Sequence, residues 1–308
     1  MGAREWALLV VLSVLWGASF YFFKVLIAQL PILTIVLGRL GLAALLMNLL
    51  MVLKGNALPS SPRLWGAFIV MGLLNNVVPF ILLVWSEIRI SSGLAAILNA
   101  TTPIFAVIVA HFTTANEKLN WSKGIGLLCG FLGVIVLIGP SILADVGGDQ
   151  LPADLVCLLA AFIFALAGIY GRRFKDVPSL TVATGQVTAS TLVLLPITLV
   201  ADQPWNLPNP SIHAWGALAG IAVLSTAIAY VMYFRILAAA GATNTLLVTF
   251  LVPISAILLG VVFLNEAFTT QTLAGMLLIA LGLAAIDGRA AAALRRAAIF
   301  KASPRAPD

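Results

Sequence analysis

The residues of this chain that could bind a small molecule are polar and aromatic side chains scattered through long apolar segments. Polar groups in hydrocarbon are costly and usually face a protein interior or a water-filled cavity. Amides and hydroxyls can hydrogen-bond a neutral or zwitterionic solute, a guanidinium can bind a carboxylate, and aromatic rings can stack on a cation or an apolar group. The candidate substrate-binding residues are Trp16, Phe20, Arg39, Asn75, Asn76, Asn99, Thr102, Thr226, Tyr230 and Thr245.

The spacing of these residues places several of them on shared helix faces. Asn99 and Thr102 are three residues apart, and Thr226 and Tyr230 are four apart, so each pair lies on one side of a helix. Taken singly, each polar residue fits a cavity lining and an interhelical hydrogen bond equally well. The same holds for the aromatic candidates, which could equally pack in the core.

Two basic residues lie inside apolar segments and need different explanations. Arg39 lies about 12 Å along its segment at the helical rise per residue, and a charge at the centre of a span costs about 2.5–3.5 kcal/mol. We therefore expect its guanidinium to face the helix bundle and to meet polar groups there. Lys24 lies nearer the end of its segment, so we expect it to extend toward the lipid headgroups.

The sequence carries no constellation typical of catalysis or of metal binding. The two cysteines, Cys129 and Cys157, lie within apolar stretches, and the two histidines, His111 and His213, are far apart. A zinc site needs three or four converging ligands, and an intramembrane enzyme needs a nucleophile and a base at matched depth. We expect no enzyme activity, no cofactor and no metal site.

Acidic residues are absent from the middle of the apolar segments. Proton- or sodium-coupled carriers commonly use a buried Asp or Glu, so we expect solute movement by facilitated diffusion. Glu117 and Glu266 follow apolar segments in similar contexts. We expect them to cap the next helix or to pair with nearby basic residues such as Lys118.

Composition indicates that lipid surrounds the helices that carry these residues. Hydrophobic residues make up 62% of the 308 residues and charged residues only 9%, with a mean hydropathy of +1.11. Soluble chains carry about 25% charged residues. Runs long enough to span a bilayer predict an all-α integral membrane protein with ten transmembrane helices, over about 5–27, 32–53, 64–86, 92–112, 121–139, 152–171, 179–200, 212–236, 241–263 and 271–287.

Basic residues predict the orientation of these helices. The net charge of +6 comes from Lys and Arg that gather in alternate connections and in the C-terminal tail, while the opposite connections hold mainly Asp. This bias indicates that both termini are cytoplasmic in a multi-pass protein of the cell inner (plasma) membrane. Because the positive residues are dispersed, we expect lipid and a small-molecule substrate as partners, not nucleic acid, for a monomer or homodimer.

The chain contains an internal repeat. An offset of 149 residues pairs Asn116-Glu117 with Asn265-Glu266, and an offset of 150 pairs Pro103 with Pro253 and Phe80 with Tyr230. The 149-residue offset also pairs Gly126 with Gly275 and Gly133 with Gly282. Each half has five spans, so the second must enter the membrane from the opposite side. Two inverted five-helix repeats are typical of secondary transporters, although duplication kept only for packing would leave the same pattern.

The repeated pattern of proline, Asn-Glu and two glycines resembles the EamA-type domain of the drug/metabolite transporter superfamily. Trp16-Gly17 in the first span and Arg39 in the second also match the sequence pattern of that family. The second half departs from it, since Ala165 lies near the position equivalent to Trp16. The resemblance covers about residues 5–288. It implies one repeat over 5–140, a second over 151–288, a basic cytoplasmic tail over 289–308, and export or exchange of small metabolites, with amino-acid exporters of the YddG type as the nearest analogy.

We therefore expect a membrane transporter, an exporter or facilitator, of small organic metabolites, with amino acids as the first substrate class, that works by alternating access at a midplane cavity. Drugs, amines or sugars are alternative substrates in the same fold, and a channel is a further alternative. Pro103 and Pro253 each remove a helix hydrogen bond and are candidate hinges for gating, or static kinks. We expect the glycines of the fifth and tenth spans to form close helix contacts.

Overall fold

All the regular structure in the described part of the chain is helical. The computed structural model describes residues 3–113, 121–144, 150–240 and 248–287. Seven helical spans in these ranges are long and apolar enough to cross a membrane, and shorter apolar helices cover Gly124–Val136, Leu251–Leu264 and Thr270–Gly282. The expected all-α membrane fold with ten spans is confirmed.

The helices of each repeat follow one order. The first five spans are α1 (Ala3–Leu26), α2 (Ile32–Leu53), α3 with α4 (Pro62–Gly72 and Val78–Glu87), α5 with α6 (Ser92–Asn99 and Thr102–Thr113) and α7 (Trp121–Ala144). The second five are α8 (Gln150–Gly171), α9 (Ser179–Ala201), α10 with α11 (Ile212–Ala222 and Ala229–Ala240), α13 (Val248–Leu264) and α14 (Thr270–Asp287).

The third and eighth spans each contain a π-helical turn at their middle. These turns cover Leu73–Val77 between α3 and α4 and Val223–Ile228 between α10 and α11. They begin 150 residues apart, which is the offset that pairs Phe80 with Tyr230. Pro79 follows the first turn at the start of α4, where a proline cannot donate to the regular helical ladder. Insertions of this kind are frequent at functional sites.

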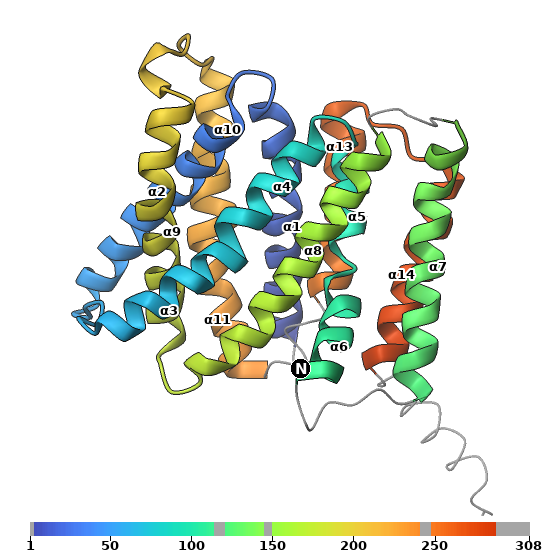
Figure 1. The fold of residues 1–308 in the computed structure, drawn as a ribbon, viewed down its shortest axis with the longest axis horizontal. Helices are drawn as coiled ribbons and strands as arrows, with labels where there is room; N and C mark the ends of the chain where they lie inside the picture. The colour runs from blue at the N-terminus through green and yellow to red at the C-terminus, as the bar shows by residue number, and fades with distance from the viewer. Residues whose placement is uncertain (1–2, 114–120, 145–149, 241–247, 288–308) are drawn as a thin grey trace, which may run out of the picture.

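The two halves run in opposite directions. In Figure 1 the N-terminus of α1 lies at the lower edge, and the connection between α8 and α9 lies at that edge as well. Helix α1 therefore begins at the edge where α8, its counterpart in the second repeat, ends. An odd number of spans per repeat produces this inversion.

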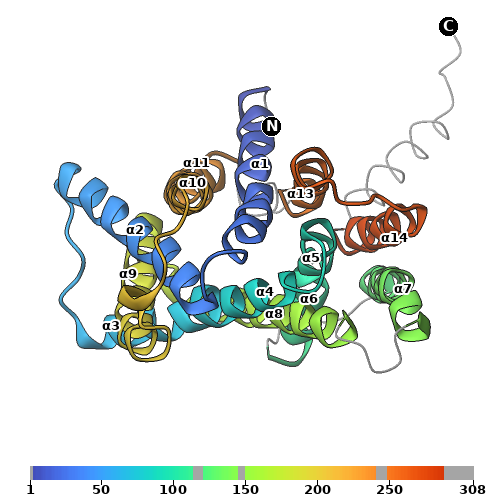
Figure 2. The same ribbon diagram turned by 90° about the horizontal axis from the view of Figure 1, so that it is seen from above.

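Helix packing repeats with the same symmetry. Helix α7 packs on α14 and α2 packs on α9, so each of these pairs joins equivalent helices of the two halves (Figure 2). The contact of α1 with α13 is matched by the contact of α6 and α5 with α8. Likewise, the contact of α4 with α8 is matched by that of α10 and α11 with α1. The substrate-binding candidates therefore lie on helices that meet around a pseudo-two-fold axis.

Glycines bring α7 and α14 into close contact, as expected. A Cβ added at Gly133 would lie 2.8 Å from the carbonyl oxygen of Gly275, and one added at Gly282 would lie 2.6 Å from that of Gly126. The two contacts are equivalent under the 149-residue offset. Backbones can approach this closely only where no side chain intervenes.

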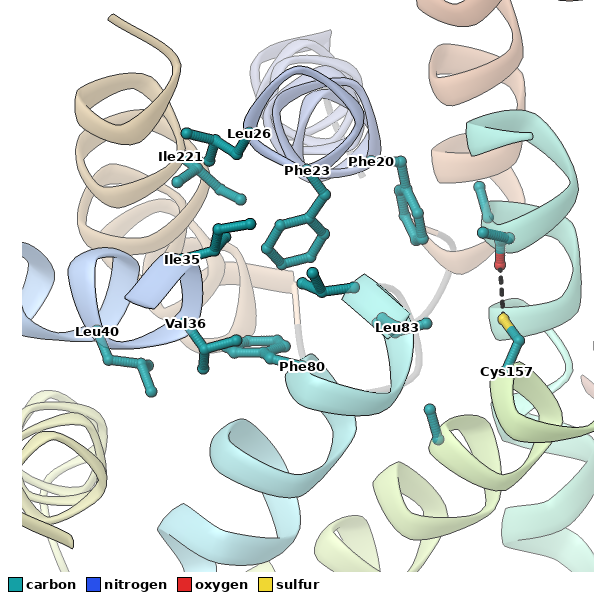
Figure 3. Packing of buried hydrophobic residues seen from close by; sticks show 14 of the residues in the cluster. Phe20, Phe23, Leu26, Ile35, Val36, Leu40, Phe80, Leu83, Cys157 and Ile221 are labelled. Atoms are coloured by element: carbon teal, nitrogen blue, oxygen red, sulfur yellow. Dashed lines mark hydrogen bonds between the residues drawn. The ribbon is translucent and has the colours of Figure 1, made fainter. Parts of the chain in front are cut away.

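The main apolar core joins helices from both halves. Figure 3 shows Phe23, Val36 and Phe80 from α1, α2 and α4 in one cluster with Ile221 from α10, and Cys157 on α8 to one side. The Sγ of Cys157 donates a hydrogen bond to the carbonyl oxygen of Ala95 on α5 (3.5 Å). Cys157 is therefore a small buried residue within the packing, as the sequence predicts.

Candidate functional site

Arg39 lies at the junction of the two repeats. Its Nε donates a hydrogen bond to Oγ1 of Thr226 in the second π turn (3.1 Å), and the residue is only 5% exposed. The guanidinium carbon lies 3.8 Å from the ring centroid of Phe80 and 5.2 Å from that of Phe23. The guanidinium thus faces the bundle, as expected, and aromatic rings supply part of the stabilisation that water would give it.

The terminal amino groups of Arg39 make no hydrogen bond within the described part of the chain. The hydrogen bond to Thr226 is made by Nε. Thr226 in turn donates from Oγ1 to the carbonyl oxygen of Ile221 (2.9 Å), which fixes its hydroxyl. A guanidinium held through Nε keeps two N–H groups in the geometry that binds a carboxylate.

A cluster of hydrogen-bonded polar residues surrounds the first π turn. The hydroxyl of Tyr230 donates to Oδ1 of Asn76 (3.3 Å), and Nδ2 of Asn76 donates to Oγ of Ser190 on α9 (3.1 Å). Nδ2 of Asn75 donates to Oε1 of Gln186, also on α9 (3.3 Å). The structure therefore brings together Asn75, Asn76 and Tyr230, and Tyr230 lies near Arg39.

Equivalent positions in the two π turns supply the polar side chains of the site. Asn76 of the first turn corresponds to Thr226 of the second, and Phe80 corresponds to Tyr230. Asn76 is fully buried and Thr226 is 1% exposed. The sequence identified Asn75, Asn76, Thr226 and Tyr230 as polar residues within spans, but it gave no sign of the π turns that hold the first three.

The aromatic candidates lie beside this group. The rings of Trp16 on α1 and Tyr233 on α11 pack with centroids 5.6 Å apart, and Tyr233 is three residues beyond Tyr230. Phe20 is 5% exposed within the main core. These positions fit either ordinary packing or the wall of a cavity adjacent to Tyr230.

The fourth span is broken at the candidate residues Asn99 and Thr102. Helix α5 ends at Asn99 and α6 begins at Thr102. Pro103 has no N–H to donate to the carbonyl oxygen of Asn99 four residues earlier, so the regular helical ladder is interrupted there. Thr102 Oγ1 donates to the carbonyl oxygen of Asn99 (2.7 Å), and Oδ1 of Asn99 is buried without a hydrogen-bond partner among the described residues. The equivalent Pro253 lies inside continuous α13, while Thr245 lies outside the described residues.

Several functional candidates escaped the sequence reasoning. Gln186 and Ser190 are four residues apart in the seventh span, so their spacing in an apolar run was a usable signal. Glu87 was expected just beyond the third span, yet it is the last residue of α4 and is fully buried. Asp154, one turn into α8, is also fully buried. The absence of mid-span carboxylates therefore does not mean an absence of buried ones.

Two expectations for charged residues are wrong. Lys24 does not extend toward headgroups: its Nζ donates to the backbone carbonyl oxygens of Glu87 and of Ile90 (2.9 Å). Carbonyl groups at the end of a helix lack helical partners, and Glu87 is the last residue of α4. Glu266 does not cap the following helix. Its carboxylate accepts from the N–H of Ser92 (2.7 Å) and of Gly93 (3.2 Å) at the start of α5, which belongs to the other repeat. Glu117 lies outside the described residues.

Known proteins share this architecture. The EamA-like transporter family matches residues 4–139 and, a second time, 151–286. The uncharacterized transporter YoaV of Bacillus subtilis is 25% identical over 276 residues, which are 89% of this chain and 94% of that protein. The uncharacterized inner membrane transporter YedA of Escherichia coli K12 is 25% identical, covering 82% of this chain and 80% of its own. A solved crystal structure, 18% identical, superposes with a TM-score of 0.65 over 93% of this chain and 98% of its own, which shows the shared fold.

Proposed function

Because this chain belongs to the EamA-like transporter family and is therefore a membrane transporter, we propose that it carries small zwitterionic metabolites, with amino acids as the substrate class. The observation that carries this proposal is the environment of Arg39. A buried guanidinium stacks on two aromatic rings, is held through Nε, and has terminal amino groups without hydrogen-bond partners in the described chain. This arrangement suits a carboxylate.

The neutral neighbours of Arg39 suit the remainder of an amino acid. Asn75, Asn76 and Tyr230 offer amide and hydroxyl groups that accept and donate hydrogen bonds without strong selection by charge. Phosphorylated sugars would call for several buried cations, and in the described chain Arg39 is the only Lys or Arg that is buried. The single cation of the site would bind the one carboxylate of an amino acid, and the neutral polar groups would accommodate its short polar or apolar side chain.

The location of the site supports transport by alternating access. The Arg39–Thr226 hydrogen bond joins α2 of the first repeat to the π turn of the second. Inverted repeats commonly hold the substrate between the halves, which rock about it. We take the two five-helix units, 5–140 and 151–288, as the rocking bodies, and the break before Pro103 as the hinge of the first unit.

We further propose that the protein lies in the inner membrane with both termini in the cytoplasm. The connections at the edge that carries the N-terminus hold exposed Lys54, Arg63, Arg172, Arg173 and Lys175 (Figure 1). Basic residues accumulate on the cytoplasmic side of membrane proteins. The printed name of the relative YedA places that protein in the inner membrane.

The test is counterflow in proteoliposomes, with labelled amino acids compared with their amides. The amide keeps the amino group and the side chain but lacks the carboxylate. We expect the wild-type protein to exchange the acid and to discriminate against the amide by about tenfold or more, the value of one charge-assisted hydrogen-bond pair. Arg39→Leu should lose this discrimination, whereas Arg63→Leu, at an exposed position, should keep it.

Two results would contradict the proposal. Exchange of amines or sugars without exchange of amino acids would assign the carrier to those substrates. Unaltered discrimination between acid and amide in a folded Arg39→Leu protein would show that the carboxylate binds elsewhere.

A further inference from the structure

Glu87 is a buried ionisable side chain near Arg39 whose carboxyl group has no hydrogen-bond partner in the described part of the chain. It is the last residue of α4 and is 0% exposed. An ionised carboxylate buried without donors costs several kcal/mol, whereas the protonated acid avoids most of that cost. The geometry therefore favours a neutral, proton-carrying Glu87 in this conformation.

The basic group nearest Glu87 is directed at the backbone instead of the carboxylate. Nζ of Lys24 on α1 donates to the carbonyl oxygens of Glu87 and Ile90. Arg39 on α2 also acts on Glu87 electrostatically, but its Nε is bound to Thr226. Neither cation forms a hydrogen-bonded pair with the carboxylate among the described contacts.

One of the remaining titratable neighbours opposes a negative charge on Glu87. Glu266, in the connection after α13, acts on it as a like charge. Across from α4, Cys157 on α8 lies near enough to interact with both Glu87 and Asp154. Asp154 is one turn earlier on α8, and both of its carboxylate oxygens are likewise buried without partners in the described chain. Glu87 thus lies beside one like charge, while a thiol and a second unpartnered carboxyl group lie on α8, which packs against α4.

We propose that Glu87 is a proton-binding site that couples solute transport to a proton gradient. The inference rests on the proposed function as a solute carrier and adds the coupling ion. It replaces the uncoupled diffusion that the sequence predicts, because that prediction depended on there being no carboxylate in the interior.

The coupling step exchanges the partners of Lys24. When α1 and α4 move apart just far enough to admit water, the ammonium of Lys24 leaves the two carbonyl oxygens but stays within reach of the carboxyl group. Glu87 then releases its proton to that water, and the resulting carboxylate pairs with Lys24, which keeps its own proton. Reprotonation of Glu87 restores the neutral acid and lets the helices close again.

A direct measurement of the proton needs no knowledge of the solute. Infrared difference spectra of the protein in lipid, between acidic and alkaline buffer, report the carbonyl stretch of protonated carboxylic acids. We expect a titrating band in the wild-type protein that Glu87→Gln removes and Glu87→Asp shifts. Gln has the shape of the neutral acid, so the Glu87→Gln variant should fold. The control variant is Asp176→Asn, at an exposed position between α8 and α9, which should keep the band.

The transport arm uses a labelled amino acid exchanged by the wild-type protein. We expect an imposed pH gradient to drive its accumulation in wild-type and Asp176→Asn liposomes, with the gradient-driven excess lost in Glu87→Gln. If the titrating infrared band persists in Glu87→Gln, Glu87 is not the proton-binding residue. The same conclusion follows if the band disappears only in Asp154→Asn. Accumulation driven by a sodium gradient and not by a proton gradient would also overturn the proposal. If no amino acid exchanges at all, the proposed substrate class fails, and the infrared band still decides whether Glu87 binds the proton.

Discussion

The carboxylate of Glu266 accepts a hydrogen bond from the hydroxyl of Ser92, with 2.8 Å between Oε2 and Oγ, and the two residues belong to different repeats. The same carboxylate accepts from the backbone N–H groups of Ser92 and Gly93, which are unpaired donors at the start of α5. A negative charge there also interacts favourably with the helix dipole. The glutamate of the Asn-Glu motif in the second half therefore links the end of α13 to the start of α5 by hydrogen bonds.

Removing the charge of Glu266 should loosen this contact. We expect Glu266→Gln to lower the free energy of unfolding by about 1–2 kcal/mol, the difference between charged and neutral hydrogen-bond acceptors. Hydrogen exchange measured by mass spectrometry should show faster exchange at the amides of Ser92 and Gly93. If hydrogen exchange at these two amides is the same in Glu266→Gln as in the wild-type protein, the carboxylate does not stabilise the start of α5.

Asn265, the residue before Glu266, has an unusual backbone conformation. Its backbone adopts φ 54°, in the left-handed region, directly after α13 ends. Glycine and asparagine adopt this conformation readily, and other residues less so. We expect Asn265→Gly to keep wild-type thermal stability in detergent and Asn265→Ala to lose about 1 kcal/mol. Equal losses in the two variants would mean that the asparagine side chain, not the backbone conformation, is required.

Close packing of α7 on α14 should depend on Gly282. An added methyl group there would lie 2.6 Å from the carbonyl oxygen of Gly126 and 2.7 Å from the nitrogen of Gly130. Overpacking of this kind costs about 1–3 kcal/mol, so Gly282→Ala should lower the thermal unfolding temperature. Gly124→Ala on α7 is the matched control, since nothing lies within 4 Å of its added Cβ. It should be neutral or stabilising, and a loss as large as that of Gly282→Ala would refute the contact.

Lys24 should contribute to stability through the end of α4. Replacing it with Met removes the donor to two backbone carbonyl oxygens. Because hydrogen bonds to charged groups contribute about 1.5–3 kcal/mol, we expect Lys24→Met to lose at least that much in chemical or thermal unfolding. Lys175→Met, at an exposed position, serves as the control. A Lys24→Met protein as stable as the control would support the headgroup position that the sequence suggests.

The sequence by itself determined the membrane class, the ten spans and the internal repeat. Apolar runs, polar punctuation and the recurring Asn-Glu and glycine positions are local signals, and helix formation in lipid depends on little else because each segment must satisfy its own backbone. The depth of Arg39 likewise required an interior position. The same local signals identified Asn76, Thr226 and Tyr230 as polar residues within spans.

Only the tertiary structure decided which partners these residues meet. The pairing of Arg39 with Thr226, of Glu266 with Ser92 and of Lys24 with the end of α4 joins segments far apart in the chain, and composition or spacing cannot encode such distances. Glu87 shows most clearly that the tertiary structure decides the surroundings of a residue. At the end of an apolar run it resembles a residue at the membrane surface, and it becomes a buried acid only because α1, α8 and the connection after α13 close around it.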